Sequence, residues 1–201
     1  MKLILDCGSG NTCRNDKAEV KAMIDAIHAV DTGKHEIILK WQLFLDAPPN
    51  LPLNREVFNY AYHYAESLGY QTTASVFDRD SLEFLQMYDV PFIKIACRPD
   101  LYHFVDDIDN CYMSVSGRKK YHKGVTLMAC VSKYPAYVLD YQMKFPLSMI
   151  RSAISDHTEG WELYRTYKPA ILEKHFVHKR ESDNPDAGAF AVTAEELKEI
   201  M

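Results

Sequence analysis

The sequence predicts an α/β fold, a (β/α)8 TIM barrel that forms one domain over residues 1–201. Eight short apolar runs alternate with helical patterns or loops along the chain. The runs are continuously apolar, as expected of strands that are covered on both faces. Most connections between the runs are longer than the two to five residues of a hairpin turn, so the spacing of the runs favours parallel pairing of the strands. Because about 200 residues is the lower edge for this barrel, we expect a minimal version with some outer helices shortened or missing.

An open doubly wound sheet is the alternative that the same alternation allows. Eight strand units without a Gly-x-Gly-x-x-Gly fingerprint favour the closed barrel. The charged stretch 118–123 between the fifth and sixth apolar runs is too short for a full crossover helix. We therefore expect the outer ring of helices to be incomplete there.

The first half of the chain contains four predicted strands, at residues 2–7, 36–45, 71–77 and 91–97. Apolar residues at helical spacing predict a helix over 17–30, with Asn15 or Asp16 as its N-cap. The same spacing predicts a helix over 54–68 that ends at Gly69. A shorter helix is expected over 80–88.

The second half is more compressed, with predicted strands at 111–116, 125–131, 149–155 and 170–176. One or two helical turns are expected over 101–108, and a short helix over 159–167. The segment 139–145 is short and its type stays open. A final helix over 193–200 begins with a capping box, since Glu196 follows Thr193 by three residues.

The composition excludes several function classes. A net charge of −5 and a pI near 5.9 argue against a nucleic-acid partner held by bulk electrostatics. The basic stretch 118–123 is the one local candidate for a nucleic-acid contact, and a solvated loop between two strands is the simpler explanation of its charges. The opening apolar run stops at Asp6, so neither a signal peptide nor a membrane span is expected. Five cysteines without a Cys-x-x-Cys pair fit a reducing cytoplasm.

Polar residues follow the predicted strands where each strand ends. In a barrel enzyme the carboxyl ends of the strands carry the active site. Nearly every strand supplies one or two such groups to this rim. They are Asp6, Lys40, Gln42, Ser75, Lys94, Ser114, Ser116, Ser132, Tyr134, Ser155, His157, Glu173 and His175.

Two lysines and two histidines in this set indicate specific chemistry. Both faces of an all-parallel sheet are covered, so a lysine in one of its strands is buried. Lys40 and Lys94 therefore each need an anionic partner. A bound phosphate satisfies both, whereas Lys40 alone could be an edge-strand charge. His157 and His175 close neighbouring strands, which favours a divalent-metal site. Taken singly, either histidine could equally be structural.

In these residues the chain resembles the sialic acid synthase family, barrel enzymes that condense phosphoenolpyruvate with N-acetylmannosamine or a related sugar. The resemblance runs over nearly the whole chain. It rests on Val90-Pro91-Phe92-Ile93-Lys94-Ile95, Tyr134-Pro135, Ser155-Asp156-His157-Thr158, Ile171-Leu172-Glu173-Lys174-His175-Phe176, and Pro185-Asp186 followed by Thr193-Ala194-Glu195-Glu196-Leu197.

The resemblance implies roles for individual residues. His157 and His175 would bind a divalent metal, manganese or magnesium. The catalytic residues would be Asp6, Lys40, Lys94 and Glu173, with the two lysines on the carboxylate and phosphate of phosphoenolpyruvate. The substrate-binding residues would be Gln42, Ser75, Ser116, Ser132, Tyr134, Ser155 and Asp186.

The implied reaction is a metal-dependent condensation of phosphoenolpyruvate with an aldehyde sugar. The sugar would be an N-acylated aminosugar such as N-acetylmannosamine, and the products a sialic-acid-like 2-keto acid and phosphate. Neither a nucleic acid nor a membrane would be a partner. A homodimer is an open expectation, because the family dimerises partly through a C-terminal antifreeze-like domain that these 201 residues lack.

Departures from the family leave two alternatives open. Asp6 replaces a glutamate, Gly10-Asn11-Thr12-Cys13 replaces an Asn-His-Asn-Gly turn, and Cys97-Arg98-Pro99 replaces Ser-Gly-Glu. One alternative is a degenerate barrel that binds a ligand or a partner without turnover. The other is a phosphoenolpyruvate aldolase that acts on a sugar phosphate, with Arg98 for the second phosphate.

Overall fold

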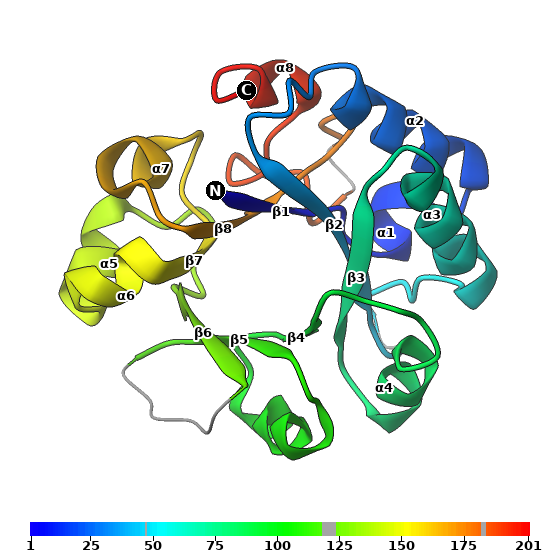
Figure 1. Ribbon diagram of the computed structural model, residues 1–201, viewed down its shortest axis with the longest axis horizontal. Coiled ribbons are helices and arrows are strands. Elements are labelled where there is room, and N and C mark those ends of the chain that lie inside the picture. Colours follow the sequence, from blue (N-terminus) through cyan, green and yellow to red (C-terminus); the bar gives the residue numbers. More distant parts are fainter. Residues whose placement is uncertain (47, 118–123, 182–183) are drawn as a thin grey trace.

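The chain folds into a closed barrel of eight parallel strands, which confirms the predicted fold class (Figure 1). The structure is a computed structural model that describes residues 1–46, 48–117, 124–181 and 184–201. The strands follow one another around the barrel in chain order. They are β1 (Lys2–Asp6), β2 (Glu36–Leu43), β3 (Gln71–Val76), β4 (Ile93–Ile95), β5 (Cys111–Val115), β6 (Val125–Cys130), β7 (Ala153–Asp156) and β8 (Ile171–His175).

The barrel closes where β1 pairs with β8 in addition to β2. Asp6 at the end of β1 is level with Lys40 of β2 on one side and with His175 of β8 on the other. On the far side of β2, Gln42 is level with Ser75 of β3. Because every pairing is parallel, the carboxyl ends of all strands lie at the same end of the barrel.

Inward-facing side chains form two layers of opposite character. The layer nearer the amino ends of the strands is apolar, and within it the rings of Phe92 and Tyr112 stack with centroids 3.9 Å apart. Its buried members are Ile4, Ile38, Phe92, Tyr112, Met128 and Ala153. Two residues further along each strand the inward positions become polar, as at Asp6 and Lys40. The apolar layer therefore closes the floor beneath a polar chamber.

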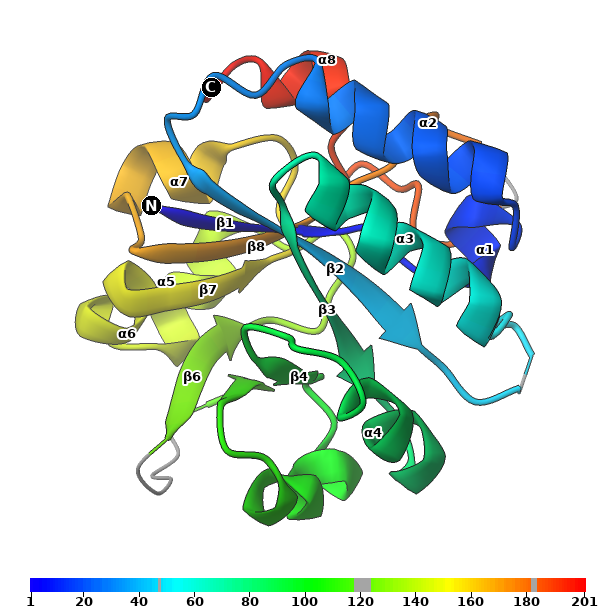
Figure 2. The ribbon, with the colours of Figure 1, turned by 45° about the vertical axis from the view of Figure 1, so that its right-hand side comes forward.

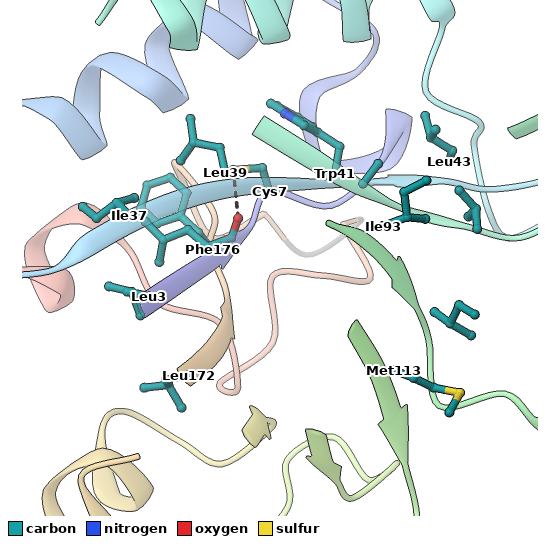
Figure 3. Close-up of a cluster of buried hydrophobic side chains, with 14 of the residues drawn as sticks. Leu3, Cys7, Ile37, Leu39, Trp41, Leu43, Ile93, Met113, Leu172 and Phe176 are labelled. Carbon is teal, nitrogen blue, oxygen red and sulfur yellow. Dashed lines mark hydrogen bonds between the residues drawn. The ribbon is translucent and has the colours of Figure 1, made fainter. Parts of the chain in front are cut away.

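Outward-facing strand residues pack beneath the helices and form the main core. Along β2, Ile37, Leu39, Trp41 and Leu43 share this outward face, and Figure 3 shows them in sequence along the strand. Leu3 and Phe176 belong to the same cluster. Burial of both faces explains why the strand sequences are continuously apolar up to their polar ends.

The helices surround most of the barrel (Figures 1 and 2). They are α1 (Gly10–Cys13), α2 (Lys17–His28), α3 (Arg55–Ser67), α4 (Arg79–Leu85), the 3-10 helix η1 (Pro99–Asp107), α5 (Val138–Lys144), α6 (Leu147–Ser152), α7 (Glu162–Tyr167) and α8 (Ala194–Leu197). Asp16 caps α2 by accepting a hydrogen bond from the N–H of Ala18 at 2.8 Å, as predicted. Thr193 and Glu196 form the predicted capping box at α8.

The outer ring is thin beside β5 and β6, as expected. Residues 116, 117 and 124, the described part of this connection, contain no helix. The basic stretch 118–123 lies outside the described residues. The longest described helix, α3, has 13 residues, and none in the described part of the chain is long and apolar enough to cross a bilayer.

One predicted strand is partly wrong. Residues 149–152 belong to the helix α6, and β7 covers only Ala153–Asp156. Met149 and Ile150 extend an apolar run whose length and hydropathy suit a buried helical turn as well as a strand. Pro146 is the N-cap of α6 and fixes the start of the helix just before this run. The segment 139–145, whose type the sequence leaves open, is helical over 139–144 as part of α5, and Phe145 is the C-cap of that helix.

Candidate functional site

A pocket opens at the carboxyl ends of the strands, directly above the apolar floor. Its empty space, including the solvent at its open mouth, is about 380 Å³. All eight strands contribute side chains to it. The lining residues are Asp6, Lys40, Gln42, Ser75, Phe77, Lys94, Ala96, Cys97, Ser114, Cys130, Tyr134, Ser155, His157, Glu173 and His175.

Lys40 is a buried cation held on one side of the pocket. Its Nζ lies 2.7 Å from Asp6 Oδ2, donates to Ser75 Oγ at 3.2 Å, and lies 3.7 Å from Glu173 Oε1. Gln42 Nε2 also donates to Asp6 Oδ2, at 2.9 Å. Burial acts to lower the pKa of Lys40, but the carboxylates of Asp6 and Glu173 outweigh it and raise that pKa. Lys40 is therefore charged at neutral pH.

Asp6 is the ionised partner of this lysine. Burial favours the neutral acid, but Lys40, His175 and the N–H of Gly8 outweigh burial and lower the pKa of Asp6 to about 2. The Gly8 N–H donates to Asp6 Oδ1 at 3.1 Å. Both carboxylate oxygens of Asp6 are thus engaged by donors.

Lys94 reaches the same chamber from β4. Its Nζ donates to Ser114 Oγ at 2.7 Å and to the carbonyl of Ile95 at 3.2 Å, and it lies 3.6 Å from Glu173 Oε1. Ser155 Oγ donates to that same Glu173 oxygen at 2.9 Å. One oxygen of Glu173 therefore lies between two buried ammonium groups, at a distance from each that is longer than a hydrogen bond.

The two ammonium groups retain donor capacity. An ammonium has three N–H donors, and within the described residues Lys40 and Lys94 each direct two of them at hydrogen-bond distance. Glu173 Oε2 is buried and has no hydrogen-bond partner in the same described part of the chain. Together these groups can bind an anion through the lysines and a donor, such as a hydroxyl or water, through Glu173.

His157 presents a neutral nitrogen to the pocket. Its Nδ1 lies 2.7 Å from the carbonyl of Val131, which can only accept a hydrogen bond, so Nδ1 carries the proton and Nε2 carries the lone pair. Burial is the largest cause that lowers the pKa of His157 to about 3, and His175 adds to it. Nε2 lies 3.5 Å from Ser155 Oγ. A histidine whose second nitrogen donates to a carbonyl is the usual arrangement of a metal ligand.

His175 lies beside His157 at the end of β8, with ring centroids 5.5 Å apart. Its buried Nδ1 has no hydrogen-bond partner among the described residues. Asp6 Oδ2 and Asp186 Oδ1 each lie 3.7 Å from this nitrogen, beyond hydrogen-bond distance. Burial raises the pKa of Asp186, while His175 opposes that effect.

The residues present fit a divalent metal in part. The lone pair of His157 Nε2 and the unpartnered Nδ1 of His175 are two nitrogen donors at one edge of the pocket. Within residues 1–46, 48–117, 124–181 and 184–201, no three His, Cys, Asp or Glu side chains are grouped to hold a metal ion. A metal here would therefore take its remaining ligands from water or substrate, as open catalytic sites do.

Aromatic rings form one wall next to the histidines. The Tyr134 ring lies 4.2 Å from the His157 ring and 5.0 Å from Phe190, centroid to centroid, and Phe190 lies 5.1 Å from His175. Tyr134 is half exposed, with 53% of its surface accessible. This wall confines the histidine edge of the pocket while its outer end stays open to solvent.

The turn after β1 brings Asp186 toward the pocket. Gly8 has a φ of +73°, and a Cβ at this position would lie 2.0 Å from Thr12 Oγ1 and 2.8 Å from Asp186 Oδ2. Thr12 Oγ1 donates to that same Asp186 oxygen at 3.0 Å. Only glycine fits both the conformation and the space.

Ten of the thirteen residues predicted for the site line this pocket, and three do not. Asp186 lies at its edge beside His175, whereas Ser116 and Ser132 are exposed to solvent. The ten are Asp6, Lys40, Gln42, Ser75, Lys94, Tyr134, Ser155, His157, Glu173 and His175.

The pocket also contains residues outside the predicted site set. Ser114 lies two residues before Ser116 on the inward face of β5 and touches Lys94. Cys130 occupies the matching inward position of β6, two residues after Met128. Ser114 is one of the polar strand-end residues predicted for the rim, and counting by two from the apolar layer would have identified Cys130 as well. Phe77 follows β3, and Ala96 and Cys97 follow β4. The two-residue periodicity of a strand does not extend to these positions.

Solved structures share the barrel. A synthetase of N-acetylneuraminic (sialic) acid from Leptospira borgpetersenii serovar Hardjo-bovis, in complex with citrate, superposes with a TM-score of 0.71 at 20% identity, over 98% of this chain and 80% of that one. A spore coat polysaccharide biosynthesis protein from Bacillus subtilis gives 0.72 at 21% identity, over 98% and 65%. A truncated 3-deoxy-D-arabino-heptulosonate 7-phosphate synthase from Thermotoga maritima gives 0.69 at 10% identity, over 99% and 83%.

At these identities the superpositions establish the fold alone, and this chain spans just under two thirds of the Bacillus protein. No curated protein matches the chain. The family model described as the NeuB family matches residues 100–201, just over half of the chain. The matched segment contains β5 to β8, and with them the two histidines and Glu173. This chain belongs to the NeuB family.

Proposed function

We propose that the chain is a sugar-acid synthase that condenses phosphoenolpyruvate with an aldehyde sugar, an N-acylated aminosugar such as N-acetylmannosamine, and releases phosphate. The observation that carries the proposal is the approach of two buried ammonium groups, Lys40 and Lys94, to one oxygen of Glu173 beside a pair of histidines. Membership of the NeuB family supports the same class of reaction.

The lysines would bind the anionic substrate. Phosphoenolpyruvate carries a carboxylate and a phosphate, and the unused N–H donors of Lys40 and Lys94 would each hydrogen-bond one of them. Ser75 and Ser114 hold the two ammonium groups in place. Because the chamber is largely shielded from solvent, these charges would act on the substrate more strongly than in water.

A divalent metal, manganese or magnesium, would be held by His157 and His175. When bound, it would supply Lewis acidity to the aldehyde oxygen of the sugar. His157 needs no deprotonation to serve as a ligand, because its Nε2 already carries a lone pair. The Tyr134 ring beside it would orient the sugar in the histidine half of the pocket.

The proposed chemistry joins C3 of the enol phosphate to the aldehyde carbon. The aldehyde oxygen becomes a hydroxyl, and water adds to C2 of the enol phosphate. The C2–O bond to phosphate then breaks, which leaves the 2-keto acid and inorganic phosphate. Glu173 Oε2, which is buried and unpartnered within the described residues, would accept a proton from the attacking water.

A non-catalytic barrel is the second candidate function. It is favoured by the short contact of 2.7 Å between Lys40 and Asp6, which engages part of the cationic charge within the protein itself. Such a barrel would bind the anion without turning it over. Calorimetric titration with phosphoenolpyruvate and manganese distinguishes the two, since binding without phosphate release would favour this candidate.

The test incubates the full chain with manganese, phosphoenolpyruvate and a panel of sugar aldehydes, and measures both phosphate and the 2-keto acid. We expect aldehyde-dependent phosphate that Lys94→Met and His157→Gln each reduce by about 100-fold or more. Lys2→Met is the matched control, because Lys2 starts β1 at the opposite end of the barrel. No aldehyde-dependent phosphate from wild type, or equal release from the pocket variants, would reject the proposal.

A further inference from the structure

Two cysteine thiols meet in the wall of the pocket. Cys130 is the last residue of β6, and Cys97 follows β4 by two residues, just before η1. Both line the pocket, and each side chain shifts the pKa of the other. Cys130 is buried whereas Cys97 is only partly so, and both are free thiols. The mechanism above uses neither of them.

The surroundings of Cys97 favour its thiolate. The hydrogen bond from Cys130 is the largest cause that lowers the pKa of Cys97 to about 6, and Ser132, Tyr102 and the Lys94 charge add to it against the effect of burial. The same interaction, together with burial, raises the pKa of Cys130. Cys97 thus has the properties of a reactive thiol, namely a stabilised anion and access to solvent.

The other cysteines have none of these properties. Cys7, Cys13 and Cys111 are buried, and burial is the largest cause that raises the pKa of Cys111 to about 11 and that of Cys13 to about 11. Reactivity should therefore be confined to the pocket pair. These three cysteines also serve as internal references in a labelling experiment.

We propose that Cys97 and Cys130 form a peroxide-sensitive dithiol, which hydrogen peroxide or an organic hydroperoxide converts into a disulfide in the wall of the pocket. Cys97 is the attacking sulfur because it is the partly exposed member of the pair. Cys130 is the resolving sulfur because its side chain already contacts Cys97. This arrangement of an accessible thiolate next to a second cysteine is typical of oxidation-sensitive sites.

The Cys97 thiolate attacks one peroxide oxygen, the O–O bond breaks, and Cys97 becomes a sulfenic acid while the other oxygen leaves as water or an alcohol. The Cys130 sulfur then attacks the Cys97 sulfur, an S–S bond forms, and the sulfenic oxygen leaves as water. Two thiols are oxidised and one peroxide is reduced. A dithiol reductant reverses the change.

The bond would alter the Lys94 side of the pocket. A disulfide removes the thiolate beside Lys94 and moves Cys97, which lies in the short non-helical link between β4 and η1, toward β6. An S–S length of about 2.05 Å needs a closer approach than a sulfur hydrogen bond. Any effect of this change on catalysis rests on the proposed function, but formation of the bond does not.

The experiment oxidises the reduced full chain with stoichiometric hydrogen peroxide in the presence of a chelator. Remaining thiols are capped with N-ethylmaleimide and the products are mapped by mass spectrometry without reduction. Fragment ions are needed, because Cys97 and Cys111 share the tryptic segment 95–118 when the Arg98-Pro99 bond resists cleavage. We expect a Cys97–Cys130 link that dithiothreitol removes, and alkylation of reduced Cys97 about tenfold faster than that of Cys111.

Three variants make the test decisive. Cys97→Ser should abolish the link, Cys130→Ser should instead accumulate a Cys97 sulfenic acid that dimedone traps, and Cys111→Ser should behave as wild type. The proposal is overturned if folded wild type keeps both pocket thiols free after peroxide, or if Cys97 pairs with another cysteine. Circular dichroism verifies that each variant is folded.

A separate arm distinguishes this proposal from the proposed function. Phosphoenolpyruvate bound near Lys94 should slow the alkylation of Cys97 in wild type. If the disulfide forms but phosphoenolpyruvate gives no protection and no phosphate is released, the dithiol stands and the proposed function fails. If protection is seen and no disulfide forms, the dithiol fails alone.

Discussion

Lys174 Nζ lies 3.2 Å from Asp156 Oδ2, and both side chains are fully buried. The two residues are level with each other on the neighbouring strands β7 and β8. Asp156 Oδ1 also accepts hydrogen bonds from the N–H and the hydroxyl of Thr158, each at 2.7 Å. Because His157 follows Asp156 and His175 follows Lys174, this outward-facing ion pair fixes the two strand ends that carry the histidines.

Removal of one partner of this pair should destabilise the fold. Lys174→Met leaves Asp156 buried without its cation and should lower the free energy of unfolding by about 3–5 kcal/mol. Burial lowers the pKa of Lys174 although Asp156 opposes it, so desolvation is already a cost to the native state. The double variant Lys174→Met/Asp156→Leu should recover much of the loss. Denaturant unfolding measures both.

The matched control is Lys21→Met on α2, where Lys21 and Asp25 form an exposed pair one helical turn apart. Exposed pairs contribute little to stability. An equal loss of stability in Lys21→Met and Lys174→Met would contradict the importance of the buried pair.

Stability should also depend on pH through His157. Its pKa is about 3 in the folded protein against an unperturbed 6.5, so below pH 6.5 the unfolded chain binds a proton that the folded chain excludes. Stability is therefore fully present above pH 6.5 and declines as the pH falls toward 3. Between pH 7 and pH 5 wild type should lose about 2 kcal/mol more than His157→Gln.

This measurement uses chelator-treated protein, so that no metal competes for the histidine. The comparison with His157→Gln removes the contributions of the other histidines. Asp6 does not interfere, because its pKa of about 2 places its own contribution below this pH range. Parallel pH profiles for wild type and variant would show that His157 titrates normally.

The turn after β1 allows a prediction with a close control. Gly8 and Gly33 both have positive φ, at +73° and +74°, but a Cβ meets Thr12 and Asp186 at Gly8 and nothing within 4 Å at Gly33. Gly33→Ala should cost about 1 kcal/mol from backbone strain alone. Gly8→Ala should cost at least about 2 kcal/mol more, because backbone or side chains must move. Thermal unfolding compares the two, and equal losses would refute the steric argument.

The barrel is predictable from the sequence because each strand is an apolar run that is buried on both faces. The polar residue at the end of each run, such as Asp6 or Lys94, marks where the strand leaves the core for the pocket. Period two does not separate Ser114 from Ser116, because the two residues share a face. Ser114 lies within β5 and contacts Lys94, whereas Ser116 lies beyond the last strand residue, Val115, and is exposed. The apolar run alone does not fix the residue at which a strand ends.

Relationships between distant residues are what the sequence does not reveal. Nothing in the order of residues shows that Cys97 and Cys130 line the same pocket, because β5 separates their strands in the barrel. Residues 149–152 show a second limit, since a short apolar run suits a helix or a strand and the neighbouring Pro146 decides the outcome. Tertiary packing supplies both pieces of information.

Metal binding should be weak in the free protein and tighter with the anionic substrate. The described residues offer two histidine nitrogens and no three-residue cluster, so we expect water or the substrate to supply the remaining ligands. Electron paramagnetic resonance of manganese titrated into the chain should show tighter binding when phosphoenolpyruvate is present. His157→Gln should weaken binding by about tenfold or more, whereas His63→Gln on the exposed face of α3 should not change it. Equal affinities for the two variants would remove the histidine pair from the metal site.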